Sequence, residues 1–559
     1  MLVLVAPCLL VAFTVARPGP LPAPTLPPSF DGRSASALAD ELARDYPNRV
    51  PGSRGADGAA GWVADKLALY GLRTSVDRWR ARVPGLGKVD LQNLVAVVPG
   101  SSLDAIVFVA HRDNSVTGSA ADDNATGTAA LVELARAYAT AGLVGTRPRP
   151  RHTIVFVSTD GGAFGGFGAE HFAETPNLAG SVRAVVALDG LGASRPSRLD
   201  ISGFEPRSPA PALVRTAAIR VAEQTGEEPR RPGWLSQLVN LGMPFGFGEQ
   251  GPFLGRRISA IRLGTAGEGR ETSVTASLDE ARFAELGRAS QAILASLDGG
   301  VEIAAGTDGY VYLGGRIVRG WTIQLALLAA LVPFGVGVVD LLVRSRRRRF
   351  PLGAAWRRLR TRLALWLWAG MLVALGAIAG LFPLGEPIPP PPDSSSVRDV
   401  PIAGLAVLAV LAVAGWWRAH RHLTSMLPLT AEEELSSATV ALSALGVVAV
   451  VVGILNPYAL IFVVPSLYSW LWLPQTPAGW LRYALYLIGL AGPAIAIVSL
   501  GSQIGVGLHA PLYVVALATL GCISWPTVLA VLVWGAAATQ LGAITTSGYA
   551  RRARQSSAR

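Results

Sequence analysis

Short apolar runs alternate with amphipathic segments through the first 300 residues, and the chain then becomes almost continuously apolar. The apolar runs have strand length and predict buried strands, and the segments between them repeat their apolar positions with helical spacing. Predicted strands cover 75–79, 93–98, 106–110, 154–157, 184–188 and 258–263. Predicted helices cover 37–44, the segment from Trp62 to a stop at Gly71, the segment after Asn124, 211–222, and a last helix opening at Ser277. This alternation is typical of an α/β domain with a mostly parallel mixed sheet flanked by helices.

Beyond residue 320 the apolar runs are long enough to cross a membrane. They cover 321–343, 363–384, 401–417, 436–455, 458–474, 481–501 and 509–545. The last is long enough for one helix with a re-entrant piece, or for two helices broken at Pro526. We therefore expect an all-α polytopic membrane domain of about seven helices after the α/β domain.

Basic residues predict how this membrane domain is oriented. Arginines cluster between the first two apolar spans, after the third span, and in the last residues of the chain. Short loops rich in Arg and Lys face the cytoplasm, so these three segments are expected inside. An odd number of spans then places residues of about 33–320 outside the cytoplasm of a multi-pass cell-membrane protein, with the C-terminus inside.

Composition supports this division. The chain has 559 residues, is 51% hydrophobic and only 16% charged, and carries a formal net charge of +11. Because the basic clusters lie beside apolar spans, they indicate membrane orientation and contacts with membrane lipids, and no nucleic-acid partner is expected. The two cysteines, Cys8 and Cys522, lie in apolar segments and provide neither a disulfide framework nor a metal site.

We expect six segments in chain order. Residues 1–16 are an N-terminal membrane anchor or signal, 17–32 a Pro-rich linker, 33–300 the α/β domain, 301–320 a bridge with a β-like part at 309–315, 321–546 the membrane domain, and 547–559 a basic cytoplasmic tail.

Candidate chemistry gathers at the end of the 106–110 strand. His111 and Asp113 follow this strand directly, and the acids Asp122 and Asp123 come ten residues later, followed by Asn124 and a helical pattern. Polar side chains at the carboxyl end of a buried strand are where α/β sheets place their sites. An imidazole together with carboxylates suits a divalent metal such as zinc.

Five ordered motifs give residues 30–300 a resemblance to the M28 family of zinc peptidases, the aminopeptidase-like group. The motifs, as they stand in this sequence, are Arg49-Val50-Pro51-Gly52-Ser53, His111-Arg112-Asp113, Asp123-Asn124-Ala125-Thr126-Gly127, Leu188-Asp189-Gly190 and Gly251-Pro252-Phe253. The resemblance implies a centre of two zinc ions that share a bridging carboxylate. It implies that His111, Asp123 and Asp189 hold the first ion, with Asp123 bridging, and that Asp113 orients His111.

The residues implied for the second ion and for the general base are missing. The family places a Glu-Glu pair, base and ligand, where this chain has Gly162 and Ala163, and a last His ligand where it has Gln250. Asp160 and Glu249 are the acids near enough in sequence to substitute as a base. We therefore expect zinc, one ion at most.

Three functions fit these features. The sequence favours a membrane-anchored M28-like domain with a partly lost peptidase site. We expect a pseudoenzyme, non-catalytic or weakly active, that binds or assembles with a peptide or protein at its extracytoplasmic face. The alternative is an active zinc-dependent exopeptidase or amidase outside the cytoplasm. The third is a transport or envelope-lipid role of the membrane half, although the spans carry few of the ionisable groups that ion-coupled transport uses.

Overall fold

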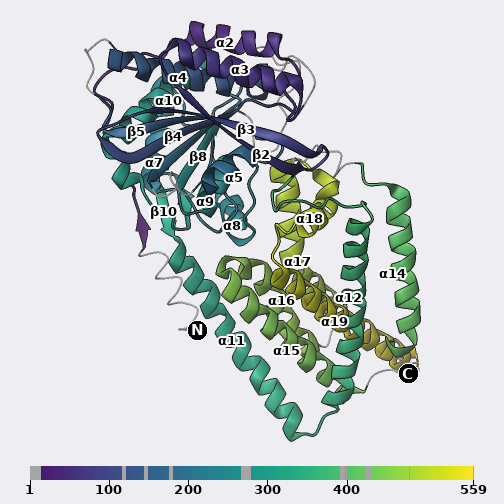
Figure 1. Cartoon of the computed structure of the whole chain (residues 1–559). Helices are drawn as coiled ribbons and strands as arrows, with labels where there is room; N and C mark the ends of the chain where they lie inside the picture. Colours follow the sequence, from purple (N-terminus) through teal and green to yellow (C-terminus); the bar gives the residue numbers. More distant parts are fainter. Residues whose placement is uncertain are drawn as a thin grey trace.

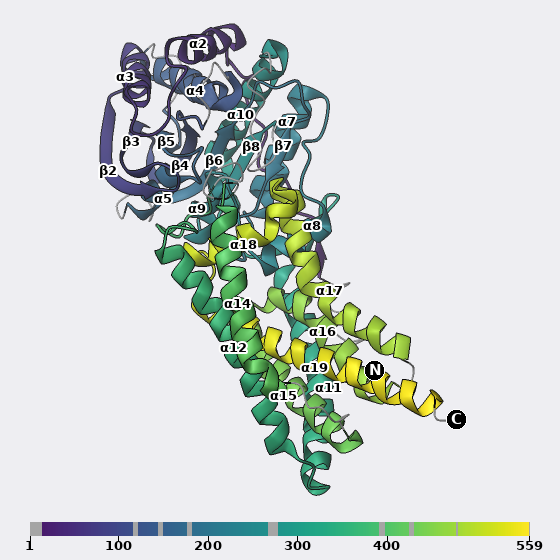
Figure 2. The same ribbon diagram turned by 90° about the vertical axis from the view of Figure 1, so that its right-hand side faces the viewer.

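A computed structural model describes residues 14–115, 121–143, 149–175, 181–265, 278–390, 397, 399–423, 430–476 and 479–557. The chain folds into an α/β half that ends near residue 319 and a helical half that begins at residue 320 (Figure 1, Figure 2). The two halves lie end to end, with the α/β half stacked on one end of the helical bundle (Figure 2).

Seven strands form the main sheet of the α/β half, in the order β2-β3-β5-β4-β6-β8-β7. The four central strands are parallel: β5 (His152–Thr159), β4 (Ser102–His111), β6 (Val182–Asp189) and β8 (Ser259–Gly264). The antiparallel strands flank them: β2 (Thr74–Val83), β3 (Gly87–Val98) and β7 (Arg198–Asp200). The carboxyl ends of the four central strands therefore meet at one edge of the sheet.

Helices cover both faces of this sheet. One face carries α2 (Gly32–Asp45), α3 (Arg54–Leu69), α4 (Thr126–Leu143), α7 (Pro211–Thr225) and α10 (Glu280–Gly300). The other face carries α5 (Phe167–Glu174) and α9 (Gln250–Gly255). Side chains of β4 alternate between the two cores, with Phe108 in the first and Val107 and Val109 in the second. Burial on both faces explains why the central strands read as continuous apolar runs.

The predicted α/β class and mixed sheet are confirmed, and the differences concern the sheet edges. The runs at 75–79 and 93–98 are parts of a long hairpin, β2–β3. Charged residues on the exposed face of β2, such as Arg78 and Arg80, break its apolar pattern, so the predicted strand is shorter than the observed one.

The last helix is capped by Asp279, whose side chain accepts the Arg282 N–H at 3.0 Å. The expected start, Ser277, lies outside the described residues.

A second, smaller sheet joins the start of the described chain to the bridge region. The β-like stretch at 309–315 is a hairpin of β9 (Tyr310–Leu313) and β10 (Arg316–Arg319), and β1 (Val15–Ala16) pairs with β10. In the predicted linker, Leu21 is buried in the main core and its N–H donates to Thr216 at 2.8 Å. The Pro-rich segment therefore lies against the α/β half. Residues 1–13, which hold most of the predicted anchor or signal, lie outside the described residues.

The described residues contain seven helices long and apolar enough to cross a membrane, as expected. They are α11 (Gly320–Arg347), α12 (Leu352–Ile378), α14 (Ile402–Leu423), α15 (Ala431–Leu455), α16 (Leu460–Trp472) with its flanking turns, α17 (Gly479–Ile504) and α19 (Trp525–Ser557). A short apolar helix, α18 (Ala510–Thr519), precedes α19. The long run at 509–545 is thus one short and one long helix, and Pro526 lies in the first turn of α19, where proline is tolerated.

The first arginine cluster lies mainly on helices and not in a loop, which corrects the expected start of the second span. Helix α12 begins at Leu352 and not near 363, so Arg357, Arg358 and Arg362 belong to its first turns. Long basic side chains keep their charged ends in water while the helix continues past the membrane boundary. The α11–α12 turn lies at the end of the bundle farthest from the α/β half (Figure 1).

Candidate functional site

His111 and Asp189 come together at the carboxyl edge of the central sheet. His111 ends β4 and Asp189 ends β6, and these strands are parallel neighbours. The Nε2 atom of His111 lies 3.6 Å from Oδ1 of Asp189. The strand register alone therefore brings two of the expected zinc ligands face to face.

Asp113 lies against the other ring nitrogen of His111. Nδ1 is 3.0 Å from the backbone oxygen of Asp113 and 3.5 Å from its carboxylate. Burial lowers the pKa of His111, but the carboxylates of Asp113 and Asp189 outweigh this effect and hold that pKa well above its ordinary value. Asp113 is thus placed to orient the imidazole, as the resemblance implies.

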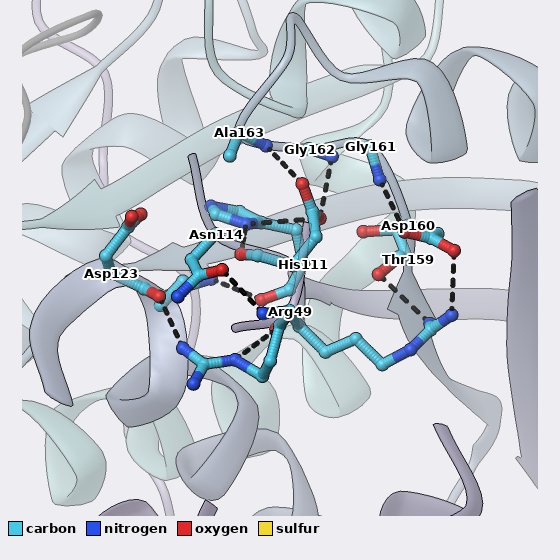
Figure 3. A network of polar contacts seen from close by, with 12 residues as sticks. Arg49, His111, Asn114, Asp123, Thr159, Asp160, Gly161, Gly162 and Ala163 are labelled. Carbon is cyan, nitrogen blue, oxygen red and sulfur yellow. Dashed lines mark hydrogen bonds and ion pairs between the residues drawn. The ribbon is translucent and has the colours of Figure 1, made fainter. Parts of the chain in front are cut away.

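The Asp113 carboxylate is held by the two positions where the family has its Glu-Glu pair. The backbone N–H groups of Gly162 and Ala163 donate to its two oxygens at 2.9 and 3.0 Å (Figure 3). A Cβ added at Gly162 would lie 2.9 Å from Cδ2 of His111 and closer still to its Cβ and Cγ. The loop therefore contributes backbone donors, and at Gly162 the His111 ring fills the space of a side chain.

Asn124 ties the two site strands together. Its side-chain nitrogen donates to the backbone oxygens of His111 and Leu188, both at 3.0 Å, and its oxygen accepts the Gly190 N–H at 2.9 Å. All of these groups are buried or at a strand end, so each bond is shielded from water. This motif residue therefore holds the ends of β4 and β6 in place.

Arg49, the first residue of the motif at 49–53, has a structural role beside the site. This arginine is fully buried, and its guanidinium donates to the backbone oxygens of Arg112 and Asp123, each at 2.8 Å (Figure 3). A third bond goes to Tyr46 O at 2.7 Å. A buried arginine is stable only when its donors are satisfied. Arg49 therefore fixes the backbone on which Asp123 is carried.

Asp123 and Asp160 lie on opposite sides of His111 (Figure 3). One Asp123 oxygen accepts the Ser115 N–H at 3.3 Å, and burial raises the pKa of Asp123 to about 6. Asp160 forms an ion pair with the buried Arg112 at 3.2 Å and also accepts N–H groups from the neighbouring backbone. Asp160 is thus part of a buried ion pair, and none of its described contacts reaches His111 or Asp189.

Arg262 is a site residue that the sequence analysis missed. It lies on β8, is only 4% exposed, and its Nε donates to Asp189 Oδ2 at 2.7 Å. Its NH1 donates to Asp200 Oδ2 at 2.6 Å. Burial raises the pKa of Asp189, but Arg262 and His111 outweigh this effect and lower it. The signal was available as an arginine within the apolar run Ser259–Gly264, where a charge requires a partner.

Glu249 has the burial and the pKa expected of a general acid or base. It is 3% exposed, one oxygen accepts the Thr159 hydroxyl, and the other has no hydrogen-bond partner among the described residues. Burial raises the pKa of Glu249 to about 7, although His111 lowers it. A carboxyl group that titrates near neutrality is suited to general acid–base chemistry.

We expect Glu249 to make stability fall with rising pH. An acid whose pKa is 4.5 when unfolded and about 7 when folded keeps its proton longer in the native state, so stability is lost as the pH rises between these values. Glu249→Gln should remove this loss, about 3 kcal/mol at pH 8. Thermal unfolding of the two full-length chains from pH 4 to pH 8 measures it: the variant's advantage should grow up to pH 7 and then level off. Parallel curves would contradict the assignment.

Gln250, at the position of the expected last ligand, makes a structural contact. Its amide nitrogen donates to the backbone oxygen of Ser202 at 3.0 Å. The two other histidines of the described α/β half are also engaged elsewhere. His152 bonds to Asp298 O at 2.9 Å, and His171 stacks on Trp79 with ring centroids 4.0 Å apart.

A segment of the helical half covers the loop beside the site. We call residues 386–390 the strap. Ile388 is 2% exposed and packs with Phe164 and Phe167, which follow Gly162 in the site loop. Tyr513 of α18 donates to the backbone oxygen of Pro390 at 2.9 Å, and its ring packs against Phe247, two residues before Glu249. Both loops that border the site are therefore held by the helical half.

The metal-binding capacity of this arrangement is limited. Among the described residues, no three His, Cys, Asp or Glu side chains converge as a metal cage. His111 Nε2 and Asp189 Oδ1 are close enough to share one ion at zinc–ligand distances of about 2 Å. The implied ligands of a second ion have no counterpart at Ala163 and Gln250, and the implied base has none at Gly162. The described site thus offers fewer ligands than the two-metal centre that the resemblance implies.

Residues 93–235 match the sequence profile of Peptidase family M28. A "Probable zinc metalloprotease" of Pyricularia oryzae is 31% identical over 166 residues, covering 26% of this chain and 32% of the relative. "Transferrin receptor protein 2" of Rattus norvegicus is 33% identical over 104 residues, covering 19% of this chain and 12% of the relative. This chain thus spans at most about a third of either relative.

Solved structures similar to the chain include a zinc aminopeptidase from Bacillus subtilis, with 13% identity, a TM-score of 0.38, and coverage of 47% of this chain and 94% of that one. A glutaminyl cyclase from an Acidobacteriales bacterium has 19% identity, a TM-score of 0.40, and coverage of 50% and 99%.

Proposed function

Because the amino-terminal half carries a Peptidase family M28 domain, we propose that this chain is a membrane-anchored binding or assembly protein whose peptidase site is partly lost. Its proposed ligand is a peptide or protein segment, because residues 93–235 match a family of peptidases. The proposal also places the α/β half outside the cytoplasm of a cell-membrane protein, with the arginine-rich turn and the C-terminus inside.

The observation that carries the proposal is the lack of space at Gly162. The family's general base stands at this position, and here the His111 ring lies where a side chain would begin. Loss of a positioned base typically costs about 10²- to 10⁴-fold in rate. Loss of the ligands at Ala163 and Gln250 also removes the second half of the two-metal clamp.

The family implies zinc, and we propose that this chain holds at most one ion, at His111, Asp123 and Asp189. When bound, zinc supplies a Lewis acid and a fixed positive charge. The chain's own residues prepare this place: Asp113 orients the imidazole, Asn124 holds the strand ends, and Arg49 fixes the backbone of Asp123.

The second candidate function is a zinc-dependent exopeptidase or amidase that uses Glu249 as its base. Its support is the unpartnered oxygen of this buried carboxyl group and its pKa near 7. Glu249 would then accept a proton at Oε2 while Thr159 holds the other oxygen. A transport or envelope-lipid role of the helical half is the third candidate, and its support is limited to the seven apolar helices.

Purified full-length protein separates the first two functions. We expect no difference in hydrolysis of aminoacyl-coumarin substrates between the wild type and His111→Ala, because neither has a working base. Zinc content by mass spectrometry should fall from about one ion per chain to none in His111→Ala and Asp189→Asn. Hydrolysis that both His111→Ala and Glu249→Gln abolish would establish the second function instead. His171→Ala, which changes a histidine outside the site, is the matched control.

A further inference from the structure

Arg262 is a buried cation shared between two carboxylates. Its guanidinium lies 2.7 Å from Asp189 and 2.6 Å from Asp200, and both contacts have charge-assisted lengths. Asp200 is 1% exposed and also accepts Arg198 Nε at 2.6 Å. A single group thus bridges an expected zinc ligand, Asp189, to a second acid that lies deeper in the fold.

The alkyl part of the Arg262 side chain lies beside the segment 248–250, where the family has its last ligand. A Cβ added at Gly248 would lie 2.6 Å from Arg262 Cδ and 2.9 Å from Gln250 Cδ. The two side chains therefore pack against the same glycine, which belongs to the segment matching the family's last-ligand motif. Arg262 thus holds the implied first-ion ligand Asp189 with its charged end, while its alkyl stem lies beside the segment that lost the second-ion ligand.

We propose that Arg262 takes over the charge-neutralising role of the second metal ion and excludes that ion from the site. The inference rests on the proposed function, in which at most one zinc is held. A guanidinium stays protonated at any physiological pH, so its positive charge does not depend on zinc supply. Unlike zinc, it has no vacant position for a water molecule or a substrate carbonyl. It therefore preserves the charge balance of the acidic cluster without the Lewis acidity of a metal.

The proposal predicts that restoring the lost histidine is insufficient while Arg262 remains. Gln250→His should leave the zinc stoichiometry of the full-length protein unchanged. Gln250→His with Arg262→Met should bind a second Zn²⁺ at least tenfold more tightly than Gln250→His alone, because the cation that repels the ion is removed and the restored imidazole supplies a ligand. Metal-stripped protein in detergent is titrated with Zn²⁺ by calorimetry, and bound zinc is counted by mass spectrometry.

Two controls separate charge from structure. Gln250→His with Arg262→Lys keeps a cation and should behave like Gln250→His alone. Gln250→His with Arg198→Met removes the arginine that contacts Asp200 but makes no described contact with Asp189, and it should also gain no second ion. Because Arg262→Met leaves a buried carboxylate unpaired, the titration is repeated with Asp200→Asn present in every chain, and folding is checked by circular dichroism and gel filtration.

A second zinc bound equally tightly by Gln250→His and by its Arg262→Met double variant would overturn the proposal, as would a folded double variant with unchanged stoichiometry. These readouts do not depend on turnover. Hydrolysis that depends on His111 would instead refute the proposed function. The zinc stoichiometry of the variants would still test the role of Arg262 separately.

Discussion

Gly162→Glu, which returns a carboxylate to the position of the family's base, is expected to destabilise the protein and to restore no hydrolysis. The new Cβ would lie within van der Waals distance of three His111 atoms, so either the ring or the loop must move. Movement of the loop also breaks the N–H bonds that hold Asp113. Overpacking of this kind costs about 1–3 kcal/mol, and the broken bonds add to it. Thermal unfolding of the full-length chain measures the loss of stability, and an assay with aminoacyl-coumarin substrates measures hydrolysis.

Ala163→Glu is the matched control. Ala163 already has a Cβ, is half-buried, and donates to Asp113 through its backbone only. The same carboxylate one residue further should therefore be tolerated with a smaller loss of stability. If Gly162→Glu were as stable as Ala163→Glu and gained hydrolysis, the His111 ring would not be what prevents a base at this position.

Ile388→Asp is expected to release the strap from the α/β half. Ile388 is 2% exposed among Phe164, Phe167 and other apolar side chains, so the change removes buried apolar area and places a carboxylate in that cluster. Loss of the isoleucine contacts alone costs about 1.5–3 kcal/mol, and an unpaired buried charge costs more. Detachment of the strap from Phe164 and Phe167 should therefore cost less free energy than burial of the new carboxylate.

Hydrogen exchange and limited proteolysis follow this release. The two backbone amides of the strap, at positions 386 and 388, and those of the loop that follows Gly161 should exchange faster in Ile388→Asp, because the loop loses its cover. Leu384→Asp, at an exposed position two residues before the strap, should leave exchange unchanged. Unchanged exchange in both variants would show that the strap does not brace the site loop. If bound peptide slows exchange in the strap of the wild type, ligand binding is coupled to the helical half.

The sequence alone was sufficient for the parts of this protein that depend on local pattern. Apolar runs of strand length gave the central strands because parallel strands are buried on both faces. Runs of about 20 apolar residues gave the helices that can cross a membrane, because the bilayer sets their length. The end of the 106–110 strand indicated His111 and Asp113, because α/β sheets place their sites at the carboxyl ends of strands, and the family resemblance implied Asp189. Whether they bind zinc stays a prediction.

Features that depend on partners distant in sequence were decided only by the tertiary structure. The partners of Arg262 could not be assigned from the sequence, because Asp189 and Asp200 lie 73 and 62 residues away. The strap could not be assigned either, because Ile388 lies more than 200 residues from the loop it covers. The sequence showed that Gly162 lacks a carboxylate, but only packing showed that His111 occupies its space. The sequence pattern indicates how buried each element is and how its residues are spaced. Which distant residues contact one another depends on packing and charge pairing in the folded chain.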